Sequence, residues 1–97
     1  MAELVVEGDV LSLSGELSVA TVSRYYETGL AAIDQGASVQ IDLAGANIVG
    51  SAGIALMIAW QRRALEQDKP ITIVNAPEHF LDMAEVSGVR DILPFND

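Results

Sequence analysis

Apolar and polar residues alternate in the first part of the chain. Two short apolar runs, Leu4–Val6 and Val10–Leu13, are separated by Glu7, Gly8 and Asp9. Gly-Asp is typical of tight turns, so the two runs are predicted to form a β-hairpin. Beyond the turn, leucines alternate with serines, which predicts a strand with one buried and one solvated face.

Apolar residues then recur at spacings of three and four, as they do in an amphipathic helix. The predicted buried stripe of this helix consists of Val19, Val22, Tyr26, Leu30 and Ile33. Ser18 precedes the stripe as a candidate N-cap, and Gly36 follows it where helices commonly end. We therefore expect one helix between Ser18 and Gly36, with one buried face.

Later apolar stretches complete the predicted fold. The β-branched runs 39–43 and 71–74 predict strands, a helix is expected from about 52 to 67, and another follows Pro77. The apolar side of that last helix consists of Phe80, Leu81, Ala84 and Val86, and a short packed tail is expected at 92–95. Strands that alternate with helices imply right-handed crossovers between parallel strands. The prediction is an α/β fold in a single domain, residues 1–97, with helices mainly on one face of a mixed sheet.

The stretch Ile48–Ile54 connects the strand at 39–43 to the longest predicted helix. Ser51 is the predicted N-cap of that helix, because its hydroxyl could accept a hydrogen bond from an unpaired N–H group. Gly50 and Gly53 would let the backbone turn and let another surface approach closely. This end of the helix therefore has either a purely structural role or a role as a contact site for a partner.

The long helix carries two apolar stripes instead of one. The first consists of Ile54, Met57, Ile58, Gln61 and Leu65, and the second of Ala52, Leu56, Trp60 and Arg63. A second stripe implies either deep burial or a surface kept for a partner, and Trp and Arg are enriched in binding hot spots. Trp60 as an ordinary core residue is the equal alternative. The candidate partner-binding residues are Gly50, Ser51, Ala52, Gly53, Leu56, Trp60 and Arg63.

Charge and composition exclude several kinds of partner. Fourteen acidic and five basic residues give a formal net charge of −9, which disfavours nucleic acid and direct contact with an anionic membrane. The 51% of apolar residues suffices for a core, and the chain has no cysteine. We see no signal-peptide pattern and no apolar run of about 20 residues, so a cytoplasmic protein without membrane insertion is expected.

Residues that carry chemistry are scarce. Gly45–Ser51 has the glycine spacing of a phosphate-binding loop but lacks its lysine, and no nucleophile elbow is present. His79 is the only histidine and is expected to be a surface residue, which leaves no set of ligands for a metal. We therefore expect no enzymatic activity, no cofactor and no metal site.

The order of elements and the Ser51 stretch resemble the STAS domain family, named for sulfate transporters and anti-sigma factor antagonists. The family has a strand ending in an Asp-Leu pair, a short loop, and Asp-Ser/Thr-x-Gly-Leu/Ile at the start of the second helix. Asp42-Leu43 and Gly50–Ile54 occupy these places. Ser51 matches the serine that a partner kinase phosphorylates in anti-sigma factor antagonists, whereas Gly50 stands where the family commonly has Asp.

Within the family, the chain is most similar to MlaB-like subunits of the Mla phospholipid-transport ABC system. The similar segments are Ala59-Trp60, Ile73–Pro77, Leu81–Ala84, Val86–Val89 and Ile92–Pro94. The resemblance implies a non-enzymatic subunit that binds the transporter's cytoplasmic ATPase and is peripheral to the inner membrane through that complex. The alternative is an anti-sigma factor antagonist whose partner is an anti-sigma factor kinase and which is switched by phosphorylation of Ser51.

Overall fold

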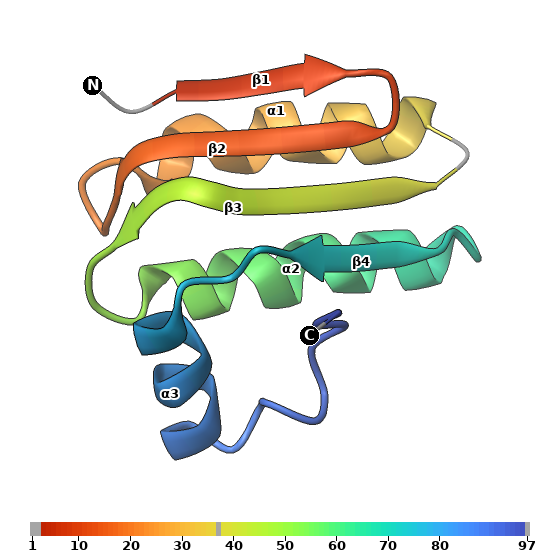
Figure 1. The fold of residues 1–97 in the computed structure, drawn as a ribbon. Helices are drawn as coiled ribbons and strands as arrows, with labels where there is room; N and C mark the ends of the chain where they lie inside the picture. The colour runs from red at the N-terminus through yellow and green to blue at the C-terminus, as the bar shows by residue number, and fades with distance from the viewer. Residues whose placement is uncertain (1–2, 37, 97) are drawn as a thin grey trace.

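Four strands and three helices alternate along the chain in a computed structural model that describes residues 3–36 and 38–96 (Figure 1). Their bounds are β1 Glu3–Glu7, β2 Val10–Leu17, α1 Val22–Gln35, β3 Val39–Ile48, α2 Ala52–Glu66, β4 Ile71–Val74 and α3 Glu78–Val86. The order is the one predicted from the sequence, and the predicted α/β class is confirmed.

The sheet has the order β1-β2-β3-β4, with β1 and β2 antiparallel and the other two pairs parallel. The predicted hairpin and mixed sheet are thus confirmed. β3 is longer than the strand predicted at 39–43 and also includes residues 44–48. The pairing of β2 with β3 shifts between Ser12 and Ser14, which accommodates one extra residue of β3. At this bulge the Asp42 carboxylate accepts a hydrogen bond from the backbone N–H of Ala44 at 2.9 Å.

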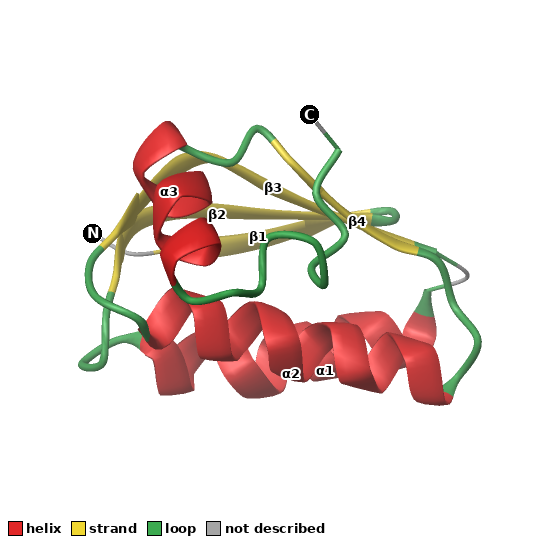
Figure 2. Ribbon diagram, turned by 90° about the horizontal axis from the view of Figure 1, so that it is seen from below, coloured by secondary structure: helices red, strands yellow, loops and turns green. Residues whose placement is uncertain are grey.

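Helices α1 and α2 lie side by side on one face of the sheet (Figure 2), while α3 lies beyond the β4 edge (Figure 1). The prediction of helices mainly on one face is therefore confirmed by the two long helices. The C-terminal tail follows the same β4 edge, where Ile73 donates its N–H to the carbonyl of Pro94 and accepts from the N–H of Asn96, both at 2.9 Å. This edge of the sheet is covered, and Leu93 of the tail is buried in the core.

The buried side of α1 differs from the predicted stripe. Tyr25, Gly29 and Ile33 are buried, whereas Tyr26 is exposed and Val19, 81% exposed, precedes the helix. The helix begins late because Thr21 closes a turn: its hydroxyl accepts the N–H of Ser18 at 3.0 Å and donates to the carbonyl of Glu16 at 2.9 Å. The predicted N-cap at Ser18 is thus wrong, while the predicted end of the helix at Gly36 is confirmed.

Both stripes of α2 enter the core except at their last members, Leu65 and Arg63, so the core alternative is the correct interpretation of Trp60. Its side chain is 0% exposed, and its indole N–H donates to the carbonyl of Tyr26 on α1 at 3.3 Å. The indole packs against Gly29, where a Cβ atom would lie only 2.2 Å from two ring carbons. Two residues predicted to be buried, Leu65 of α2 and Val86 of α3, are exposed.

Candidate partner-binding surface

Three loops meet at one end of the sheet, because β2, β3 and β4 are parallel and end on the same side (Figure 1). They are residues 18–21, 49–51 and 75–77. The backbone N–H of Val49, in the second loop, donates at 2.9 Å to the carbonyl of Leu17, the last residue of β2 before the first loop. We call the residues 49–51 the Ser51 loop; it lies between the end of β3 and the beginning of α2.

Ser51 is exposed at the N-cap position of α2, yet it does not cap the helix with its side chain. Within residues 3–36 and 38–96 its hydroxyl makes no cap hydrogen bond, and the residue has φ −93° and ψ 0°. A capping hydroxyl generally needs an extended backbone at this position, so the predicted cap bond is wrong. Instead, the Ser51 carbonyl accepts the N–H groups of Ile54 at 3.1 Å and Ala55 at 3.3 Å. Gly50, with φ +73°, supplies the left-handed residue that the turn requires.

The residues directly after Ser51 are buried. Ala52, Gly53 and Leu56 contribute no substantial surface, and a Cβ atom on Gly53 would lie 2.8 Å from Ile48 Cγ2 and 3.3 Å from Phe80 Cε1. Gly53 therefore permits the close approach of β3 and α3 to the start of α2. Among the predicted partner-binding residues, these three and Trp60 support the surface from beneath.

The loops at this end of the sheet and the first turn of α2 also carry exposed apolar side chains that were not among the predicted partner-binding residues. Val19 and Val49, which is 47% exposed, stand on the two neighbouring loops, and Ala55 is exposed one turn into α2. Beside them, a hollow of about 360 Å³ between α1 and α2 is lined by Val22, Ser23, Tyr26, Ala55, Leu56 and Ala59. The small residues at 55 and 59, four apart on α2, were the available sequence signal for this hollow.

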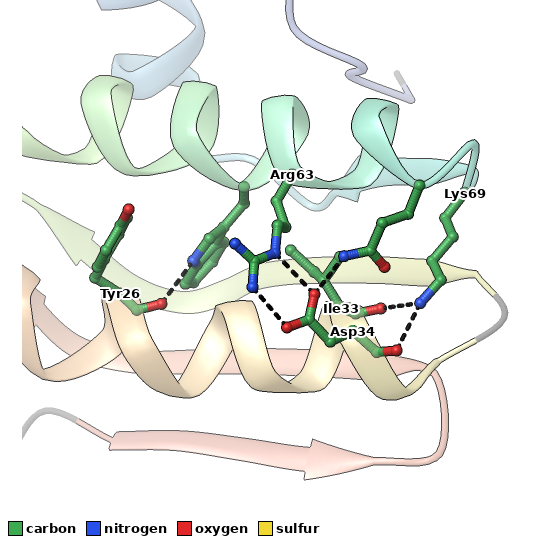
Figure 3. A network of polar contacts seen from close by, with 7 residues as sticks. Tyr26, Ile33, Asp34, Arg63 and Lys69 are labelled. Carbon is green, nitrogen blue, oxygen red and sulfur yellow. Dashed lines mark hydrogen bonds and ion pairs between the residues drawn. The ribbon is translucent and has the colours of Figure 1, made fainter.

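Arg63, the last predicted partner residue, belongs to the other end of α2, roughly 18 Å from Ser51 along the helix. Its guanidinium donates to the two carboxylate oxygens of Asp34 at 2.8 and 2.7 Å (Figure 3). The Gln67 side-chain amide donates to the same carboxylate, and the Lys69 ammonium donates to the carbonyls of Ile33 and Asp34, both at 2.7 Å. We call this cluster the Asp34 clamp.

The hydrogen bonds of the clamp shift two pKa values in opposite directions. The hydrogen bonds from Arg63, and then that from Gln67, hold the pKa of Asp34 well below its usual range. The same carboxylate raises the pKa of Arg63. The Arg63 guanidinium is therefore bound to Asp34 within the protein. It lies at the other end of α2 and does not share a surface with the Ser51 loop.

His79 lies in the first turn of α3, close to the end of β3. Its Nε2 atom lies 3.1 Å from the carbonyl oxygen of Ile48, the last residue of β3. The residue is exposed, as expected from the sequence, but it has a partner that the sequence analysis did not foresee. In the part of the chain that the structure describes, no helix has the length and hydrophobicity to cross a membrane.

The family model described as "Mlab, STAS domain" matches residues 2–94. The chain belongs to the STAS domain family. Comparison with curated proteins gives no match. Solved structures show that the similarity extends over nearly the whole fold. An anti-sigma factor antagonist from Mycobacterium paratuberculosis has 18% identity and a TM-score of 0.80, with 98% of this chain and 83% of that chain covered.

Two further structures represent the two roles found in the family. An anti-sigma-factor antagonist (STAS) domain protein from Planctomyces limnophilus has 25% identity and a TM-score of 0.75, with 97% of this chain and 87% of that one covered. A chain of the Acinetobacter MlaFEDB complex has 21% identity and a TM-score of 0.77, with 90% of this chain and 93% of that chain covered. The fold is thus shared by an Mla complex and by anti-sigma factor antagonists, and members of the family act as regulatory or accessory proteins.

Proposed function

We propose that this protein is a non-enzymatic accessory subunit that binds the cytoplasmic ATPase of an Mla-type phospholipid-transport ABC complex. In this role it would support the assembly or activity of a complex that maintains the lipid asymmetry of the outer membrane. The observation that carries the proposal is the match of residues 2–94 to the MlaB-labelled family model. Gly50, in place of the acidic residue that commonly precedes the phosphorylated serine, also favours this role over a phosphorylation switch.

The Ser51 loop is the proposed contact with the ATPase. Gly50 and Ser51 are exposed and carry little side-chain bulk, so a partner can approach the backbone at the start of α2. Val49 and Ala55 add apolar area on either side. The hollow between α1 and α2 could accept an apolar side chain of the partner, because its lining is almost entirely hydrocarbon.

An anti-sigma factor antagonist switched by phosphorylation is the second candidate. It is supported by the exposed Ser51 hydroxyl, for which the described residues offer no cap hydrogen bond. A phosphate on this residue would lie at the N-terminus of α2, where unpaired N–H groups and the helix dipole stabilise negative charge. In this role the partner would be an anti-sigma factor kinase.

Charge substitutions at Ser51 test the proposal. Ser51→Asp should leave the fold intact but weaken binding to the ATPase about 100-fold or more, because an unpaired buried charge costs several kcal/mol. Ser51→Arg should bind less still because of its bulk, whereas Ser51→Ala should bind within a few fold of wild type. Titration of the purified variants against the ATPase measures these effects, with circular dichroism as the folding control.

A matched control for these variants is available on α1. Thr28 is exposed and does not line the hollow, so Thr28→Asp and Thr28→Arg change charge and size similarly without touching the proposed surface. Wild-type affinity of both Ser51 charge variants would place the ATPase surface elsewhere. If the wild-type protein does not bind the ATPase but binds an anti-sigma factor kinase that phosphorylates Ser51, the protein is an anti-sigma factor antagonist.

A further inference from the structure

The only histidine of the chain contacts the segment that leads into the proposed binding surface. His79 lies in the first turn of α3, and its Nε2 atom is 3.1 Å from the carbonyl oxygen of Ile48. Ile48 is the last residue of β3, three positions before Ser51. The carbonyl is an acceptor only, so this contact is a hydrogen bond when the ring carries a proton on Nε2.

Apart from His79, backbone hydrogen bonds determine the path of the Ser51 loop, because the Ser51 carbonyl accepts the N–H groups of Ile54 and Ala55. The N–H of Val49 is bonded to the carbonyl of Leu17, but the Ser51 side chain adds no cap bond within the described residues. A Cβ atom on Gly50 would meet no described atom within 4 Å, so the space beside that residue is open. The loop therefore depends on its two ends, and His79 binds the end that belongs to β3.

The residue after His79 supports the other end of the loop. Phe80 is fully buried and packs against Gly53, where an added Cβ atom would lie 3.3 Å from Phe80 Cε1 and 2.8 Å from Ile48 Cγ2. Phe80 is itself held edge-to-face by Phe95 of the tail, with ring centroids 5.9 Å apart. Two adjacent residues of α3 thus contact the strand before the Ser51 loop and the helix after it.

We propose that His79 is a positioning residue that holds the Ser51 loop in the conformation met by the partner. The inference rests on the proposed function only for the partner's identity. Without the Nε2–H bond, the Ser51 loop populates other conformations. The apparent affinity for the partner then falls in proportion to the fraction of molecules whose loop is still in the binding conformation. A net hydrogen bond of ordinary strength corresponds to a loss of about three- to tenfold.

Substitutions of His79 separate positioning from general stability. His79→Ala removes the donor and should weaken ATPase binding about three- to tenfold. His79→Gln carries an N–H group the same number of bonds from the backbone as Nε2 and should restore affinity. In His79→Asn the amide nitrogen is one bond closer to the backbone, at the distance of Nδ1, so this variant should not restore affinity. The control is Val86→Ala, an exposed position on the same helix, which should bind as wild type.

Two spectroscopic measurements test the contact without any partner. Nitrogen-15 NMR of the neutral imidazole should show the Nε2–H tautomer, and a dominant Nδ1–H tautomer would overturn the proposal. Amide exchange at Val49 should accelerate in His79→Ala and recover in His79→Gln, while exchange at Ile73, bonded to Pro94, stays unchanged.

The outcomes distinguish this inference from the proposed function. If wild type binds the ATPase and His79→Ala binds equally well, positioning by His79 is wrong while the proposed function stands. If wild type does not bind the ATPase, the proposed function fails, and exchange at Val49 still decides whether His79 orders the loop. Unchanged exchange at Val49 in His79→Ala would overturn the inference in either case.

Discussion

The two ends of α2 are built in opposite ways. At the C-terminal end, the Asp34 clamp joins α2 and the residues after it to α1 through side chains from Arg63, Gln67 and Lys69 (Figure 3). At the N-terminal end, the described residues give Ser51 no side-chain cap, and Gly50 has φ +73°. One end is fixed by polar side chains of neighbouring elements, and the other exposes backbone with little side-chain cover.

This difference shows how a small domain can keep a helix end accessible without losing the helix. The Lys69 ammonium satisfies the Ile33 and Asp34 carbonyls near the end of α1, which has no basic residue in its own last turn. Along its middle, α2 is held by Trp60 and Leu56 in the core. Because these contacts position the helix, the Ser51 end does not need a strong cap of its own.

Gly29→Ala should have the largest effect, because it breaks the contact that holds the middle of α2. The added Cβ would lie 2.2 Å from the Trp60 ring, and overpacking of this kind costs about 3 kcal/mol. This loss exceeds the gain of about 1 kcal/mol that alanine brings to a helix. Urea unfolding measures the change, with Thr28→Ala at the adjacent exposed position as control. If Gly29→Ala were as stable as wild type, α1 and α2 would have to move apart at little cost to make room for the added Cβ atom.

Lys69→Met should have the second-largest effect, because it removes part of the Asp34 clamp at the C-terminal end of α2. The methionine keeps most of the side-chain length but cannot donate to the Ile33 and Asp34 carbonyls. Loss of this interaction at the end of α1 should lower the free energy of unfolding by about 1 kcal/mol. Arg62→Met, at an exposed position of α2, should change it much less when unfolded in parallel. Equal losses in the two variants would argue against a specific role of Lys69.

Asp34→Asn should have a smaller effect that depends on pH. The folded-state pKa of Asp34 is lowered, so its stabilisation is fully present above the unfolded pKa of about 4 and is lost as pH falls further. The melting temperature of the variant should lie a few degrees or less below wild type at neutral pH, since both partners are more than a third exposed. The difference should shrink below pH 4 and in high salt; a constant offset would contradict the predicted ion pair.

The elements of the fold were predictable because their signals are local. Alternation and turn residues located the hairpin, and helical periodicity located α1, α2 and α3. The errors arose where a specific contact overrides the periodic pattern, either a local one, as at Thr21, or one with a distant strand or helix. Val19 is excluded from α1 by the turn at Thr21, Tyr25 replaces Tyr26 because Gly29 packs on Trp60, and 44–48 extend β3 by pairing with β2.

The position of the Ser51 loop in the fold was predictable, but the contacts around it were not. Glycine and serine before a helix located the Ser51 loop. The sequence did not reveal that Trp60 is buried, that Arg63 binds Asp34, or that His79 reaches Ile48. Each of these contacts joins residues about 30 positions apart, and no local pattern encodes such a pairing.

Ser51→Ala should have the smallest effect on stability and sharpens the contrast between helix beginnings. If Ser51 capped α2, its removal would cost about 0.5–2 kcal/mol, but the described residues give its hydroxyl no such bond. We therefore expect a change within about 0.5 kcal/mol. Thr21→Ala is the matched variant, because the Thr21 hydroxyl bonds to Ser18 and Glu16 before α1, and it should lose about 1 kcal/mol. Equal losses in parallel urea titrations would show that Ser51 stabilises α2 as strongly as Thr21 stabilises α1, and the asymmetry between the ends of α2 would not hold.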